Sequence, residues 1–159
     1  SPKNYRFTCP QQLYGCNYVR KCIDEKACVT LTDLPYERVN QQYVIDNYKP
    51  TDMILVSRGA KGNKSNTNYN NFWSEIFKDI PKYKCEVNTR DYSNGDIMYE
   101  KVKGIQQEFR HGFTVHSIQG ETFTETIYID MRHMTDIKMF YTAISRAKEA
   151  KQIKLVFPH

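Results

Sequence analysis

DMILVSR, residues 52–58, is the stretch that decides the fold. Its four consecutive apolar residues stand between polar ends, which is typical of a strand covered on both faces in a parallel sheet. The segments on either side, 35–48 and 66–80, carry apolar residues at helical spacing. We therefore predict helix, strand and helix in this order, because parallel neighbours need crossover helices.

The same alternation continues toward both ends of the chain. Upstream we predict a helix over 10–27, with Pro10 in its first turn, and a short β-branched strand over 28–32. Downstream we predict a strand over 126–130, a helix over about 136–147 and a last strand over 152–157.

A hairpin is predicted at Asn94-Gly95, since both residues accept positive φ and the flanking segments 83–92 and 95–102 read as strands. Strands that alternate with crossover helices indicate an α/β fold, an open and mostly parallel sheet with helices on both faces. The hairpin is then a small antiparallel insertion on that plan. The chain's 159 residues fit one domain with a real core.

Composition narrows the class of protein. With 40% hydrophobic and 26% charged residues, the chain is expected to be a soluble globular protein, and it has no apolar run of about 18 residues for a membrane span. The polar N-terminus does not resemble a signal peptide. The net charge of +5 permits binding to nucleic-acid phosphates without requiring it.

The five cysteines are an odd number and include no C-x-x-C pair. This favours reduced thiols in an intracellular, reducing compartment, the cytoplasm or nucleus. Their spacing fits a zinc site poorly, so we expect no bound metal in this chain. His111, His133 and His159 show no ligand spacing either, and no role is assigned to them.

Two polar stretches follow apolar strands, at the sheet edge where such folds bind ligands. They are SRGAKGNKSN (57–66) after MILV, and HSIQGE (116–121) after FTV. The second stretch places an imidazole, an amide, a glycine and a carboxylate close together.

The segments FTVHSIQGETF (113–123), TIYID (126–130) and MFYTAISRAKEAKQIKLV (139–156) together resemble the paired C-terminal motifs of superfamily 1 helicases of the RecD-like and UvrD-like kind. Those motifs are T-x-H-x-x-Q/K-G-x-E/T, a strand, and a helix with Y-x-A-x-S/T-R-A. NYR at 4–6 is similar to the start of the second RecA-like domain in these enzymes. The resemblance runs to about Val156 and implies a RecA-like fold for 1–159.

The chain has no G-x-x-x-x-G-K-[ST] loop and no strand-borne acidic pair placed to hold Mg²⁺. The resemblance therefore implies the second of two motor domains of a longer protein, inactive alone, which shares ATP and Mg²⁺ with an absent first RecA-like domain. RecD-like relatives often carry a small β-barrel before the T-x-H motif. Only 83–112 is available for it, so we expect a reduced hairpin insertion or a very small subdomain.

The resemblance also implies roles for single residues. Arg146 would be the arginine finger, projecting from a helix whose Phe140, Ala143, Ile144 and Ala147 pack inward, and Arg6 would make a second contact to the γ-phosphate. Near the nucleotide we expect Gln119, Gly120 and Glu121, with Thr122 as the alternative to Glu121. Nucleic acid is expected to contact Thr114, His116, Ser117, Arg58, Lys61, Lys64 and Asn66.

Each of these roles has a non-functional alternative. The basic loop could be a solvated surface loop, Gln119-Gly120 a turn without a ligand, and His116 a structural residue. We expect the partners to be single-stranded nucleic acid, taken to be DNA, and the first RecA-like domain, with no membrane and a monomeric fragment. Gln119 favours 5′-to-3′ movement. The Asn-, Lys- and Tyr-rich composition and the compact insertion look similar to helicases of large DNA viruses, which implies DNA replication at a virus replication site.

Two other functions stay open. One is a degenerate RecA-like domain that serves as a non-catalytic docking module for nucleic acid or protein. The other is an unrelated doubly wound nucleotide-binding domain that matches the motifs by chance.

Overall fold

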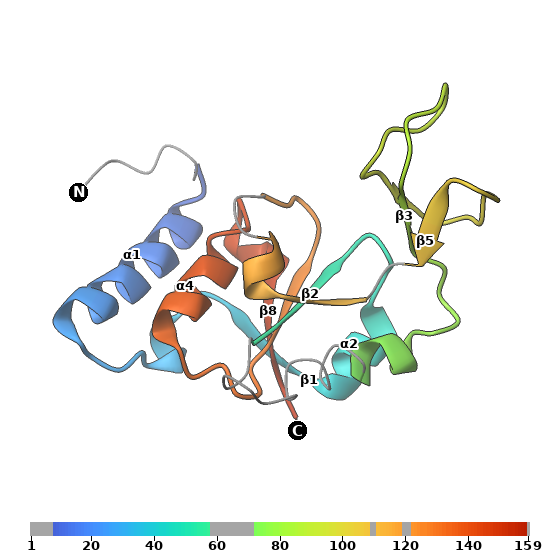
Figure 1. Ribbon diagram of the computed structural model, residues 1–159. Helices are drawn as coiled ribbons and strands as arrows, with labels where there is room; N and C mark the ends of the chain where they lie inside the picture. Colours follow the sequence, from blue (N-terminus) through green and yellow to red (C-terminus); the bar gives the residue numbers. More distant parts are fainter. Residues whose placement is uncertain (1–7, 58–71, 109–110, 119–121, 159) are drawn as a thin grey trace.

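The computed structural model describes residues 8–57, 72–108, 111–118 and 122–158. Figure 1 shows a parallel sheet between two groups of helices, with a smaller β structure standing to one side. The elements, in chain order, are α1 (Pro10–Glu25), η1 (Leu31–Asp33), β1 (Glu37–Asn40), α2 (Gln41–Asn47), β2 (Met53–Val56), a helical segment at 72–76, β3 (Tyr83–Cys85), β4 (Ile97–Met98), β5 (Gln106–Glu108), β6 (Gly112–Thr114), η2 (Val115–Ile118), β7 (Ile127–Asp130), α4 (Ile137–Ile144), η3 (Ala150–Gln152) and β8 (Ile153–Phe157).

The main sheet has five strands in the order β1-β8-β7-β2-β6, and every neighbouring pair is parallel. β2 lies between β7 and β6, so the stretch that opened the sequence argument is an interior strand. β8, the last strand in the chain, lies between β1 and β7. The predicted open, mostly parallel sheet with helices on both faces is confirmed.

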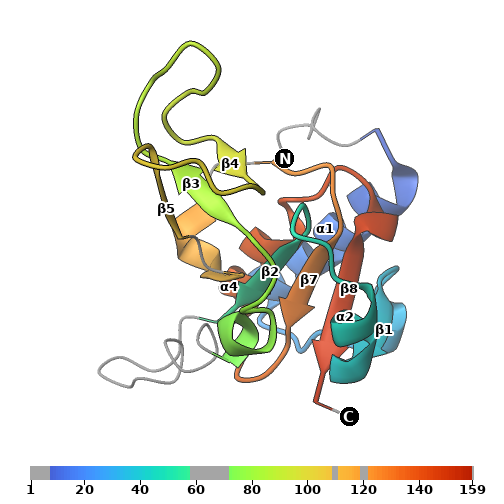
Figure 2. The same ribbon diagram turned by 90° about the vertical axis from the view of Figure 1, so that its right-hand side faces the viewer.

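Each face of the sheet has its own apolar core, because successive side chains of a strand point to opposite faces. On β7, Ile127 and Ile129 pack with residues of α1 and α4. Tyr128, between them, packs with Val44 of α2 and Trp73 of the 72–76 helix. Figure 2 gives the view at right angles, in which helices again lie on both sides of the strands.

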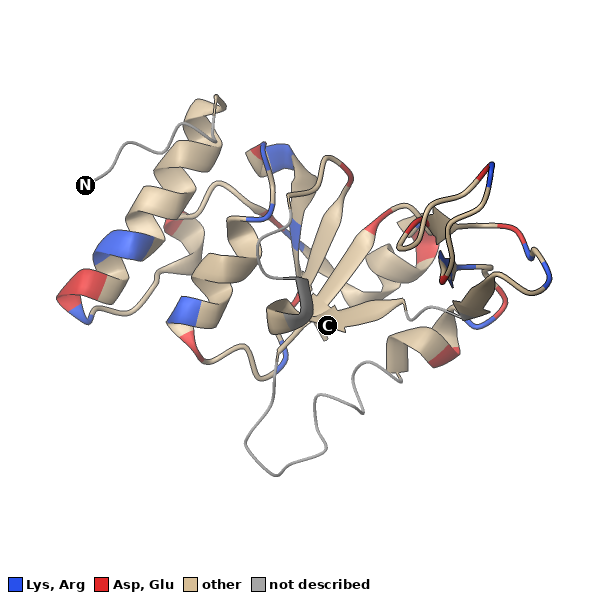
Figure 3. Ribbon diagram, turned by 45° about the horizontal axis from the view of Figure 1, so that its top comes forward, with Lys and Arg blue, Asp and Glu red and all other residues tan. Residues whose placement is uncertain are grey.

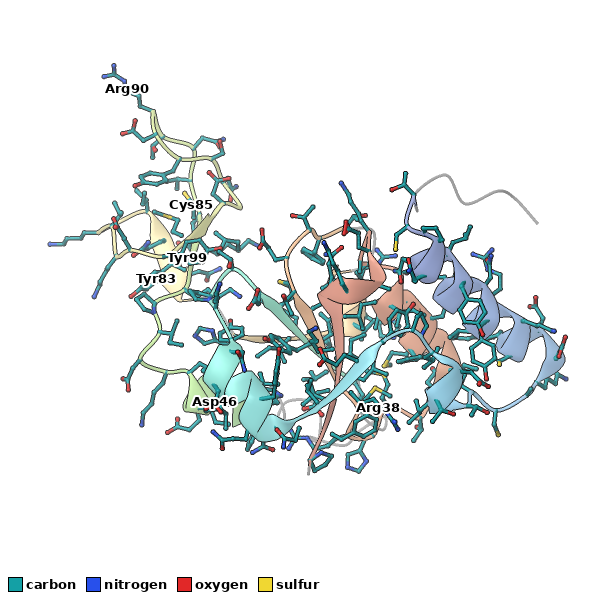
Figure 4. The ribbon with its side chains drawn as sticks, turned by 180° about the vertical axis from the view of Figure 1, so that it is seen from behind. Arg38, Asp46, Tyr83, Cys85, Arg90 and Tyr99 are labelled. Carbon is teal, nitrogen blue, oxygen red and sulfur yellow. The ribbon has the colours of Figure 1, made fainter. Side chains whose placement is uncertain are left out.

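The insertion is a separate antiparallel sheet with the order β4-β3-β5. An antiparallel hairpin is confirmed, since Tyr83 pairs with Met98 and Lys84 with Ile97. The predicted two-residue turn at Asn94-Gly95 is wrong, because residues 86–96 separate the two short strands. Of Asn94 and Gly95, only Gly95 takes a positive φ, of 98°. β5 adds a third strand that was not predicted. In Figure 4, Arg90 lies at the far end of the insertion and points away from the rest of the molecule, whereas Tyr83 lies nearer the main sheet.

Two predicted elements are wrong. The strand over 28–32 is absent, and the chain forms η1 at Leu31–Asp33 instead. The helix over 35–48 is divided, because 37–40 forms edge strand β1 beside β8 and the helix begins only at Gln41. Asn40 caps that helix by accepting a hydrogen bond from Tyr43 N at 2.8 Å. Pairing with β8 therefore outweighs the helical spacing of this segment.

Several other properties bear on function. Within the described residues, no helix has the length and apolarity needed to cross a membrane. No group of three or more His, Cys, Asp or Glu side chains in that part of the chain could hold a metal ion. All five cysteines are free thiols.

Candidate functional site

Thr114 and His116 lie where β6 ends at the carboxyl edge of the sheet. Thr114 is in register with Val56, the last residue of β2, so the two polar stretches predicted for this edge begin side by side. η2 follows at once, with Val115 fully buried and His116 exposed to solvent. Burial of Val115 fixes the short helix, and its neighbour His116 is thereby presented outward. Ser117 also belongs to η2.

Ser57, directly after β2, was not predicted as a site residue. Its side chain is only 2% exposed, and its hydroxyl has no hydrogen-bond partner among the described residues. Burial of an unpaired hydroxyl is unfavourable, so such a group calls for an explanation. It lies next to Thr114 in the sheet, at the edge where the nucleic-acid contacts are expected.

Arg146 lies in a turn beyond the end of α4. The expectation of a helix reaching Ala147, with Arg146 projecting from another face, is wrong, because α4 ends at Ile144. The side chain lies back along the last turn and is 7% exposed. Its Nε donates to Thr142 O at 3.1 Å and its Nη2 to Ser145 Oγ at 3.0 Å. The inward packing of Phe140, Ala143, Ile144 and Ala147 is confirmed.

The end of α4 is closed by partners from distant parts of the chain. Gln12 of α1 is fully buried, and its Nε2 donates to Ile144 O at 2.8 Å and to Ala147 O at 2.9 Å. Its Oε1 accepts from Tyr36 Oη at 2.8 Å. The amide of Gln12 thus bonds to two carbonyls at and just beyond the helix end, of which Ile144 O also accepts from Ala147 N at 3.3 Å. A polar residue one turn before Cys16, on the apolar face of the predicted helix, was the sequence signal for this role.

The segment 113–123, called here the T-x-H segment, and the turn 146–149 that contains Arg146, called here the arginine turn, are joined by a backbone hydrogen bond. Phe123 N donates to Arg146 O at 2.9 Å, and Phe123 forms a parallel bridge with Ala147. η2 also packs against α4. The segment with the expected nucleic-acid contacts and the turn with the expected finger therefore form one connected part of the structure.

Asp130, at the carboxyl end of β7, is the acidic residue best placed by the sheet to attract a cation. It is 2% exposed and accepts from Trp73 Nε1 at 2.9 Å. Its carboxylate also pairs with Arg132, with Nη2 and Oδ2 2.6 Å apart. Its role here is structural, because both the indole and the guanidinium already compensate the buried charge.

A cluster of buried polar side chains lies at the root of the insertion, where Lys82 precedes β3 and His111 precedes β6. Lys82 Nζ donates to Tyr48 Oη and to Asp52 O, both at 3.3 Å. Tyr48 Oη lies 2.8 Å from His111 Nδ1, and His111 Nε2 lies 3.1 Å from Ile80 O. Burial lowers the pKa of Lys82 to about 8 and that of His111 to about 4. His111 was left without a role at the sequence level.

Figure 3 shows Lys and Arg close to Asp and Glu at one end of α1 and in the insertion. Several predicted site residues lie outside the described residues, so the structure does not place them relative to Thr114 or Arg146. They are Arg6, Arg58, Lys61, Lys64, Asn66, Gln119, Gly120 and Glu121.

The parallel sheet with helices on both faces and a small antiparallel sheet has the RecA-like α/β fold. Solved structures that this chain resembles include Pif1 helicases. Bacteroides sp Pif1 in complex with ADP-AlF4 matches with a TM-score of 0.56 at 15% identity, over 96% of this chain and 50% of that chain. A Pif1 structure described for DNA unwinding at forked dsDNA by two coordinating helicases matches with a TM-score of 0.53 at 16% identity, over 96% and 48%.

Bacteroides Pif1 in complex with ADP-AlF3 and ssDNA also matches, with a TM-score of 0.53 at 13% identity, over 96% and 50%. This chain therefore spans about half the length of the structures that it matches. No family model and no curated protein matches the sequence. At such low identities the likeness establishes the fold.

Proposed function

We propose that this chain is the second RecA-like motor domain of an ATP-dependent superfamily 1 helicase that acts on single-stranded DNA. The observation that carries the proposal is the backbone link between Phe123 and Arg146, because it joins the T-x-H segment to the arginine turn. A motor needs its nucleic-acid surface coupled to its ATP cleft. The fold shared with Pif1 complexes that contain ADP-AlF3 and ssDNA supports the same function.

ATP would bind between this domain and a first RecA-like domain of the same protein. Arg146 and Arg6 would contact the γ-phosphate, and Gln119, Gly120 and Glu121 would lie toward the nucleotide. Mg²⁺ would be held by the first domain, in keeping with the lack of a suitable acidic cluster among the described residues. Thr114, His116, Ser117 and the loop with Arg58, Lys61, Lys64 and Asn66 would contact the strand through phosphate oxygens.

In the proposed reaction Arg146 stabilises the charge that develops on the transferred phosphoryl group. Its guanidinium now bonds to Thr142 O and Ser145 Oγ. On closure of the cleft it would exchange these bonds for phosphate oxygens, which its planar and permanently charged fork suits well. The RecD-like kind, 5′-to-3′ movement and a viral source stay predictions from the sequence.

The test compares the full-length parent protein with the 159-residue chain alone. The parent should hydrolyse ATP faster with single-stranded DNA than without it. The isolated chain should show no hydrolysis and only weak, salt-sensitive strand binding, because it lacks a phosphate loop. Robust hydrolysis by the isolated chain would contradict the two-domain proposal.

A second candidate is a non-catalytic docking module that keeps the fold without the motor. The burial of Arg146 favours it, since a finger must reach a facing nucleotide. The upstream sequence of the parent decides between the two. A phosphate loop followed by a strand with a metal-binding acid supports the motor, and their absence supports the module.

A further inference from the structure

Gln152, the last residue of η3, lies between the two segments on which the proposed motor depends. Its side chain is buried. Its Nε2 donates to Phe123 O and to Glu125 O, both at 2.8 Å. Its Oε1 accepts from Lys148 N at 3.0 Å and from Glu149 N at 2.8 Å.

These four hydrogen bonds use both donors of the amide and both lone-pair positions of its oxygen. The amide NH2 group donates to the chain that leads from the T-x-H segment into β7. The carbonyl edge holds the chain that follows Arg146. No other natural side chain of this length offers two donors and two acceptor positions at once, so the amide itself is required.

The amide adds to the backbone bridge between Phe123 and Ala147. The bridge joins the two segments at one point. Gln152 adds hydrogen bonds to Phe123 and Glu125 on one segment and to Lys148 and Glu149 on the other. Segments 123–125 and 146–149 are thereby tied together. η2, which carries His116, also packs against α4, the helix that leads into the turn with Arg146.

We propose that Gln152 is a positioning residue that couples DNA binding at the T-x-H segment to the placement of Arg146. The inference rests on the proposed function and deepens it, because it assigns the coupling to one side chain that touches neither ligand. Loss of the amide would separate the two responses while both segments remain in the fold.

The variant that tests this is Gln152→Glu in the full-length parent protein. A carboxylate keeps the size and the acceptors but sets an oxygen against the carbonyls of Phe123 and Glu125, where the wild type has a donor. We expect the ratio of DNA-stimulated to basal ATP hydrolysis to fall about tenfold, a usual size for coupling between two sites. The affinity for a single-stranded oligonucleotide should be unchanged.

Gln12→Glu is the matched control, because Gln12 is also a buried amide that donates to two carbonyls. It contacts Ile144 at the end of α4 and Ala147 in the turn beyond it, but not the segment 123–125. It should lower basal and stimulated hydrolysis in the same proportion and leave their ratio as in the wild type. A merely structural role for Gln152 would give the result of this control.

Gln152→Asn covers the case in which the charged variant fails to fold, since it is neutral and too short to span both segments. A wild-type ratio in a folded Gln152 variant overturns the inference alone. Parent protein without any ATP hydrolysis overturns the proposed function, and the inference with it. A reduced ratio in Gln152→Glu or Gln152→Asn, but not in Gln12→Glu, supports the coupling role.

Discussion

Ser57 carries a buried hydroxyl that no described residue satisfies, beside the strand that ends in Thr114. Ser145 offers a direct contrast. It is equally buried, but its Oγ donates to Thr142 O at 2.8 Å and accepts from Arg146 Nη2 at 3.0 Å. The two serines differ in hydrogen bonding and hardly in exposure.

Ser57→Ala should therefore raise the free energy of unfolding by about 1 kcal/mol, because it removes the desolvation cost of an unpaired group. Ser145→Ala should lower the free energy of unfolding by a similar amount. Urea denaturation of this chain measures both. Destabilisation by Ser57→Ala as large as that by Ser145→Ala would show that the Ser57 hydroxyl is bonded after all.

Arg146→Ala in the parent protein should lower the rate of ATP hydrolysis by about 1,000-fold or more, as loss of an arginine finger does elsewhere. Arg146→Lys should be nearly as slow, because an ammonium cannot reproduce the planar fork. Arg20→Ala is the control, since Arg20 of α1 bonds to Tyr141 of α4, the helix that precedes the turn with Arg146. The ATPase rate and the affinity for single-stranded DNA are measured for each variant. Near-normal hydrolysis by Arg146→Ala would support the docking module.

At the residue scale, the sequence predicted the positions of residues that belong to a recognisable motif. It missed residues whose hydrogen-bond partners are distant in the sequence. Thr114 and His116 lie at the predicted sheet edge because Thr114 ends strand β6 and His116 follows in η2. Gln12 and Gln152 were missed because the groups to which they donate are backbone carbonyls of distant residues, and backbone groups leave no pattern in a sequence. Ile144 O, for example, is 132 residues from Gln12.

At the scale of elements, the interior strands could be predicted from composition, whereas the edge strand β1 could not. β2 and β7 are apolar runs covered by helices on both faces. β1 has the sequence ERVN and becomes a strand because β8 pairs with it. β1 is stabilised by β8, which is more than 100 residues away in the sequence, so the spacing of residues within 37–40 does not predict the strand.

The chain of hydrogen bonds at the root of the insertion requires a neutral His111. A carbonyl can only accept, so His111 Nε2 donates to Ile80 O, and Nδ1 accepts from Tyr48 Oη. Tyr48 Oη can then accept from Lys82 Nζ. A proton on Nδ1 would set a donor against the Tyr48 hydroxyl and add a positive charge near Lys82.

The folded-state pKa of His111, about 4, lies below its ordinary value of 6.5, so the unfolded chain binds this proton more readily. The stabilisation is complete above pH 6.5 and is lost as the pH falls toward 4. We expect the free energy of unfolding to decrease by about 1 to 2 kcal/mol over this range through His111, less than the full pKa difference corresponds to, because solvent screens part of the interaction. Urea denaturation at several pH values measures the decrease.

His111→Gln is the comparison for this pH dependence, because Gln cannot take up the proton. The difference between the two proteins isolates His111 from the carboxyl groups that titrate in the same range. Equal slopes of stability against pH in the two proteins would contradict the role of His111.

At the scale of the whole molecule, the position of β8 determines when folding can be completed. A ribosome synthesises four strands of the main sheet before residues 153–157, yet β1 has β8 as its neighbour in that sheet. Closing so long a loop is slow, and until it closes the unpaired edges of β1 and β7 remain open to other chains. This domain is therefore expected to be more prone to aggregation before residues 153–157 leave the ribosome than after they have paired with β1 and β7.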